Sequence, residues 1–138
     1  MCLGIPIPEA EKQAIIEAGK RRGYIRVWKV VRDMNGAYSP PFGYRRLHKS
    51  GIRRAYFGYP GNDPGWHGFL DRQSVKEYYR PRRWVIIECL AKPEWLRSAG
   101  VKDSWCHTLK TATFTKLMFP EYPRRRVTVN EFKEAIRA

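Results

Sequence analysis

The segment from Trp84 to Leu90 is an almost unbroken apolar run of strand length, centred on Val85-Ile86-Ile87. Short runs of this kind, rich in β-branched residues, are typical of strands that are buried on both faces. We therefore expect a central strand over residues 83–91. Glu88 interrupts the run, and a carboxylate on a buried strand is expected to pair with an arginine or a backbone group.

The segments before this strand predict a helix and a hairpin. Pro8 to Arg22 has a proline and acidic residues at its start, basic residues at its end and a narrow apolar stripe, which indicates an amphipathic helix lying on a sheet. Tyr24 to Met34 is dense in valine and isoleucine and predicts a strand. Asn35-Gly36 predicts a tight hairpin turn, and the return strand must be brief because Pro40 and Pro41 cannot continue a ladder.

Further elements follow from local signals. Residues 66–69 predict a short strand in which Gly68 indicates a bulge or the close approach of a ligand or of another backbone segment. A short helix follows, capped by Asp71 or Ser74, and an alternating strand is expected over residues 104–118. Thr128 and Glu131 form the capping box of a final helix.

Together these elements predict the α+β class, with one mixed or antiparallel sheet, helices at both ends and a short helix between strands. The length of 138 residues suits a single domain. Within it we expect an N-terminal helix over residues 1–23, a sheet core over 24–119, and a basic segment with a C-terminal helix over 120–138.

The charge of the chain points to a polyanionic partner. Lysine and arginine number 27 against 13 acidic residues, which gives a formal net charge of +14. Such a charge attracts nucleic acid at long range, and guanidinium groups match phosphate oxygens. A basic surface without any nucleic-acid partner is the simpler alternative. No apolar run is long enough to cross a membrane, and the three cysteines lack paired spacing, so we expect a reduced, cytoplasmic compartment.

The predicted contact residues lie mostly between residues 42 and 64, where arginines alternate with aromatic rings. Such a pattern suits a surface that pairs phosphates and stacks bases, although the tyrosines have an equal chance of packing inward. The predicted nucleic-acid-binding residues are Tyr44, Arg45, Arg46, Lys49, Arg53, Arg54, Tyr56 and Tyr59, followed by Arg82, Arg83, Arg124, Arg125 and Arg126.

Several chemical sites are not supported by the sequence. Neither the phosphate-binding nor the dinucleotide-binding glycine pattern is present, and the cysteines and histidines lack metal-ligand spacing. We therefore predict no metal and no cofactor. Cys89 and Cys106 are expected to be small core residues. His67 is the one candidate reactive side chain, and a lone histidine on a strand is more often a hydrogen-bonded core residue.

Two resemblances add expectations. Gly65 to Leu70, the helical segment after it and the strand from Val85 to Ala91 resemble the middle of the ADP-ribosyltransferase fold. This resemblance implies an NAD-dependent transferase, or an RNA phosphotransferase relative, with Trp66, His67 and Arg32 lining the pocket and Glu88 taking part. The "KVV" strand at residues 29–31, the loop over residues 44–51 and the "GxHGF" strand at residues 65–69 are similar to small phage and bacterial accessory proteins, which implies a phage-encoded inhibitor of a host defence system.

The leading prediction is therefore a small basic protein that binds nucleic acid or a nucleic-acid-containing complex such as a ribonucleoprotein. The alternative is an ADP-ribosyltransferase-like enzyme that uses NAD. A third possibility is a module whose basic face binds an acidic surface on a host protein.

Overall fold

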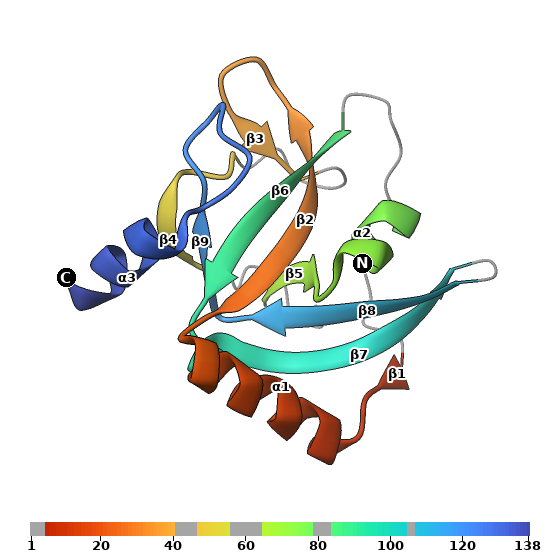
Figure 1. The fold of residues 1–138 in the computed structure, drawn as a ribbon. Helices are drawn as coiled ribbons and strands as arrows, with labels where there is room; N and C mark the ends of the chain where they lie inside the picture. The colour runs from red at the N-terminus through yellow and green to blue at the C-terminus, as the bar shows by residue number, and fades with distance from the viewer. Residues whose placement is uncertain (1–4, 41–46, 56–64, 79–83, 105–106) are drawn as a thin grey trace.

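The computed structural model describes residues 5–40, 47–55, 65–78, 84–104 and 107–138 of the chain (Figure 1). In chain order its elements are β1 (Ile5–Pro6), α1 (Glu9–Arg22), β2 (Ile25–Asp33), β3 (Tyr38–Ser39), β4 (Gly51–Arg54), β5 (Trp66–Phe69), α2 (Arg72–Tyr78), β6 (Trp84–Ala91), the 3₁₀ turn η1 (Pro93–Trp95), β7 (Leu96–Ser104), β8 (His107–Phe114), β9 (Lys116–Phe119) and α3 (Val129–Arg137).

All nine of these strands belong to one sheet, and every pairing between them is antiparallel. The strand order is β1-β7-β8-β5-β2-β6-β9-β4, with β3 attached to β2 beside this path. The predicted α+β class is confirmed, including the helices near both ends and the short helix between strands. None of the helices among the described residues is long and apolar enough to cross a bilayer.

The strand predicted to be central, now β6, pairs with β2 along its whole length, from Ile25 opposite Ala91 to Arg32 opposite Trp84. The predicted hairpin turn is also confirmed. Asn35 and Gly36 have φ values of 54° and 131°, which the right-handed twist of the flanking strands favours at a tight turn. The return strand β3 is only two residues long, as the prolines after it require.

One sequence prediction is wrong. Residues 104–118 do not form one strand, because β7 and β8 form a hairpin and a bend at Thr115 separates β8 from β9. The connection between residues 42 and 64 contains the edge strand β4, which pairs with β9.

Of the two candidate caps for α2, the carboxylate of Asp71 accepts a hydrogen bond from the backbone N–H of Ser74 at 2.7 Å.

The sheet curls on itself, because β8 pairs with β5 while β9, which follows it directly in the chain, pairs with β6. Figure 1 shows β2 and β6 running at a steep angle to β7 and β8, with α1 lying along β7. The main core fills the inside of this curl, and Cys89 is one of its fully buried members. The core placement predicted for Cys89 is confirmed, and Cys106 lies outside the described residues.

The outer face of β2 and β6 is covered at two places. Near α2, Val30, Phe69 and Val75 form one buried cluster. Near α3, a second cluster contains Leu90 and Phe132, and the predicted capping box at the start of α3 is present. The outer-face residues of β2 and β6 that lie between these two clusters can therefore line a surface pocket.

Strand β5 crosses β2 at very short range. A Cβ atom on Gly68 would lie 2.3 Å from Cγ1 of Val27 and 3.3 Å from the carbonyl oxygen of Trp28. Only glycine permits this approach, so the close backbone contact predicted at Gly68 is confirmed.

Candidate nucleic-acid interface

Trp28 and Glu88 lie opposite each other on β2 and β6, between the two covered regions of the outer face. The indole Nε1 of Trp28 donates to Oε1 of Glu88 at 2.9 Å. The other carboxylate oxygen of Glu88 lies 3.1 Å from Nε of Arg126, whose side chain remains 70% exposed. The arginine partner expected for Glu88 is therefore present, and its charge is compensated while the guanidinium still reaches solvent.

The basic segment that carries Arg126 is held on the sheet by its backbone. The N–H of Glu88 donates to the carbonyl oxygen of Arg125 at 2.7 Å, and the N–H of Val127 donates to the carbonyl oxygen of Glu88 at 3.1 Å. The hydroxyl of Tyr38 lies 2.9 Å from the carbonyl oxygen of Arg124. These bonds fix the direction in which the arginines leave the segment.

A side-chain hydrogen bond also attaches this segment to the hairpin formed by β2 and β3. The Tyr122 hydroxyl donates to Oδ1 of Asp33 at 2.7 Å. This hydrogen bond lowers the pKa of the Asp33 carboxyl and raises the pKa of the Tyr122 phenol. Arg124 points to α3 instead, where its guanidinium lies 2.7 Å from the carboxylate of Glu131.

These elements enclose a pocket of about 250 Å³ that we call the basic pocket, lined by Trp28, Arg72, Val75, Lys76, Ile86, Glu88, Arg125 and Arg126. Four of its lining side chains are cationic and one is a carboxylate. Since that carboxylate is already bonded to Trp28 and Arg126, the pocket presents a surplus of positive charge beside an aromatic ring. Such a combination can bind a phosphate and stack a base.

The predicted contact residues do not gather at one place. Arg125 and Arg126 line the basic pocket. Arg53 and Arg54 are exposed on the edge strand β4, which β6 and β9 separate from β2, and Lys49 is exposed just before it. Arg124 lies beside Glu131 of α3 and does not line the basic pocket. The other predicted contact residues lie outside the described part of the chain: Tyr44, Arg45, Arg46, Tyr56, Tyr59, Arg82 and Arg83.

The residues suggested by the transferase resemblance are likewise dispersed. Trp66 packs against the main core, and its Nε1 donates to the carbonyl oxygen of Arg53 at 2.8 Å. Glu88 lies on the outer face of the sheet, and Arg32 pairs across the strands with Trp84. The basic pocket is not lined by Trp66, His67 or Arg32. The transferase activity remains a prediction without an assembled site among the described residues.

The inside of the curled sheet holds two basic side chains near Trp66. Burial lowers the pKa of Lys29 to about 8, and its ammonium group donates to the carbonyl oxygen of His67. The His48 ring stacks on Phe119 with centroids 4.8 Å apart, and burial lowers the pKa of its imidazole to about 3. His48 is therefore neutral at physiological pH, which fits a core position.

Sequence reasoning missed Trp28, Arg72 and Lys76. A signal for the first was present, since Arg26 and Trp28 alternate with the buried Ile25 and Val27 along β2. For the α2 residues there was none, because a basic residue on a short helix is ordinarily solvated.

Side chains with metal-binding chemistry do not gather in groups of three or more His, Cys, Asp or Glu within the described ranges. The chain matches no protein-family model, no curated protein and no solved structure.

Proposed function

We propose that this protein binds nucleic acid through the basic pocket. The observation that carries the proposal is that Arg72, Lys76, Arg125 and Arg126 line the same pocket as Trp28. Phosphates supply the anions that these cations need, and bases supply the planar faces that stack on an indole. The overall charge of +14 adds long-range attraction for the same ligand.

The local geometry favours phosphate over a protein carboxylate as the anion. The four cations come from α2 on one side and from the segment before α3 on the other. A sugar–phosphate backbone carries a charge at every nucleotide and can therefore contact both sides of the pocket, whereas an acidic side chain supplies a single charge. Guanidinium groups also bind phosphate oxygens in a bidentate manner.

The experiment compares two double variants by fluorescence anisotropy with a labelled single-stranded oligonucleotide, between 50 and 200 mM salt. Arg72→Gln/Lys76→Gln removes two charges from the basic pocket, and both side chains are exposed on α2. Wild-type protein should bind in the micromolar range or tighter. The double variant should bind about tenfold more weakly, and the slope of log K against log salt should shrink by about 1.4 for two lost phosphate contacts.

The matched control is Arg53→Gln/Arg54→Gln, which removes the same charge from the exposed edge strand β4. It should change both affinity and salt slope much less than the α2 pair. The opposite ranking would place the interface at β4, where the sequence pattern predicts it, and would refute the role of the basic pocket. Salt-independent affinity, or no binding of any oligonucleotide, would refute nucleic-acid binding itself.

A further inference from the structure

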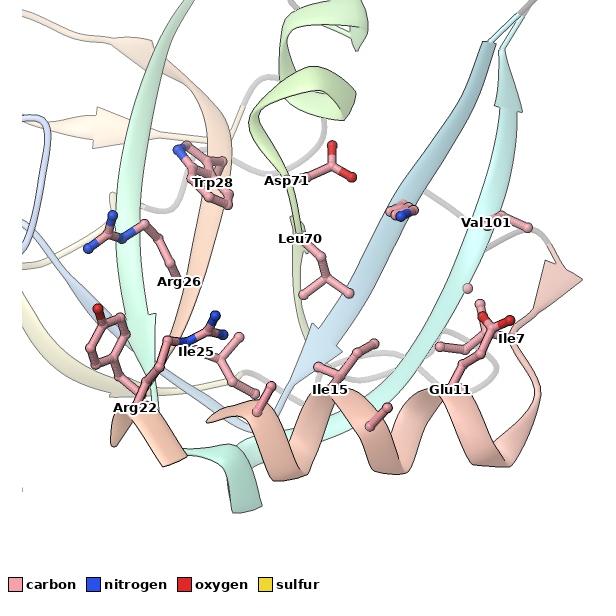
Figure 2. Close-up of a pocket in the computed structure, with 15 residues that line it drawn as sticks. Ile7, Glu11, Ile15, Arg22, Ile25, Arg26, Trp28, Leu70, Asp71 and Val101 are labelled. Atoms are coloured by element: carbon pink, nitrogen blue, oxygen red, sulfur yellow. The ribbon is translucent and has the colours of Figure 1, made fainter. Parts of the chain in front are cut away.

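A second, larger cavity adjoins the basic pocket and lies between α1 and the sheet. Its volume is about 570 Å³, within the range of roughly 300–1,000 Å³ that is typical of small-molecule sites. We call it the α1 cavity. Figure 2 shows Ile15, Ile25 and Leu70 pointing toward one another across it, so that its floor is apolar.

Trp28 connects the two sites, because its side chain lines both the α1 cavity and the basic pocket. In Figure 2 the indole lies beside Arg26 and across from Leu70 and Asp71. A chain molecule bound with its phosphates in the basic pocket would therefore pass this ring on its way into the α1 cavity.

Charged side chains surround the apolar floor. The guanidinium groups of Arg22 and Arg26 lie 5.9 and 5.6 Å from the centroid of the Tyr24 ring, and all three residues line the cavity. Two carboxylates, those of Glu11 and Asp71, line it as well. The cavity thus combines cations, hydrogen-bond acceptors, an aromatic ring and an apolar surface.

We propose that the α1 cavity receives one unpaired nucleotide of a bound strand, while neighbouring phosphates occupy the basic pocket. The apolar floor and Trp28 accept the faces of the base, the carboxylates accept hydrogen bonds from its amino groups, and Arg22 and Arg26 bind its phosphate. A base inside a duplex is stacked on both faces and cannot enter such a cavity, so the protein selects single strands or unstacked positions. This inference rests on the proposed function.

The first test needs no variant. Wild-type protein is titrated with three labelled probes that carry equal numbers of nucleotides per strand: an intact single strand, a fully abasic single strand and a duplex. The intact strand should bind about tenfold more tightly than the abasic strand, which is the effect of one stacked base. It should also bind more tightly than the duplex. Equal affinity for the intact and abasic strands, or for the intact strand and the duplex, would overturn the inference.

The second test fills the cavity. Ala14→Phe adds a ring at a lining position of α1 without a change of charge, and Ala10→Phe adds the same ring at an exposed position of α1 that does not line the cavity. The first variant should lose about tenfold affinity for the intact strand and none for the abasic strand, and the second should lose neither. An intact-strand affinity that is the same in both variants would overturn the inference.

Two further outcomes separate this inference from the proposed function. If Arg72→Gln/Lys76→Gln weakens binding while Ala14→Phe leaves the intact-strand affinity unchanged, the basic pocket binds nucleic acid and the α1 cavity does not take a base. The last measurement is the affinity of the protein for a free nucleoside monophosphate. If it binds as tightly as the intact strand, and Ala14→Phe abolishes its binding, the occupant is a free nucleotide and the strand-bound nucleotide proposed here is refuted.

Discussion

Lys29 provides a sharp test of the core, because its half-buried side chain lies on the inner face of β2 between the buried Val27 and Val31. Burial lowers the pKa of its ammonium group from 10.5 to about 8, and an electrostatic interaction with Cys89 raises it by less. The perturbation is a rise in pH from 7 to 9, compared between the wild-type protein and Lys29→Met.

The sign follows from proton binding. Between pH 8 and 10.5 the unfolded chain keeps the proton of Lys29 while the folded chain releases it, so the free energy of unfolding rises with pH in this window. The full effect amounts to about 3 kcal/mol, of which about 1.3 kcal/mol is gained between pH 7 and pH 9. Cys89 acts in the opposite direction as the pH rises through its ordinary pKa of 9, because burial raises its pKa to about 12. The comparison with Lys29→Met, which keeps Cys89, removes most of that effect.

Urea unfolding followed by tryptophan fluorescence measures the effect at pH 7, 8, 8.5 and 9. The stability of the wild-type protein relative to Lys29→Met should increase by about 1.3 kcal/mol across this range. The loss of the hydrogen bond to His67 shifts the absolute difference by a constant amount, so only the slope is diagnostic. Lys20→Met, at an exposed position of α1, serves as the control and should show no such slope. A parallel pH profile for wild type and Lys29→Met would refute the enclosure of this charge.

Two further predictions concern stability. Gly68→Ala should lower the free energy of unfolding by about 2 kcal/mol, because the new methyl group meets Val27 at 2.3 Å. In urea unfolding the penalty should shrink when Val27→Ala is present, and strict additivity of the two changes would contradict the close crossing. Thr128→Ala removes the acceptor of the Glu131 N–H and should cost about 1 kcal/mol, whereas Thr128→Ser should keep most of the stability. Equal melting temperatures for the two Thr128 variants would contradict the cap.

Local sequence signals predicted most of the elements. Three of these signals are the apolar run at β6, the Asn35-Gly36 turn and the Thr128 cap. Each depends on only a few neighbouring residues, so it can be recognised from a short stretch of sequence. The β7–β8 hairpin was missed because Lys102 to Thr108 lacks a glycine-containing turn signal.

The candidate site was less predictable, since it depends on pairings between distant segments. Glu88 was expected to pair with an arginine or a backbone group. The sequence does not show that the partner is Arg126 or that Trp28 donates a hydrogen bond to the same carboxylate. Arg53 and Arg54 matched the nucleic-acid pattern better than Arg72 and Lys76 did. Only the folded structure shows that β4 lies at the edge of the sheet, separated from β2 by β6 and β9, while α2 lines the basic pocket.

The way the basic pocket is assembled has a consequence for folding. Trp28 and Glu88 are 60 positions apart, and Tyr38 bonds to Arg124 across 86 positions. No short fragment contains the pocket, and such long-range pairings form slowly because their loops must close first. A ligand of the pocket therefore binds only chains whose β2, β6 and C-terminal segments have all docked. Its binding should raise the melting temperature of the whole fold and should report on how many molecules in a preparation have completed folding.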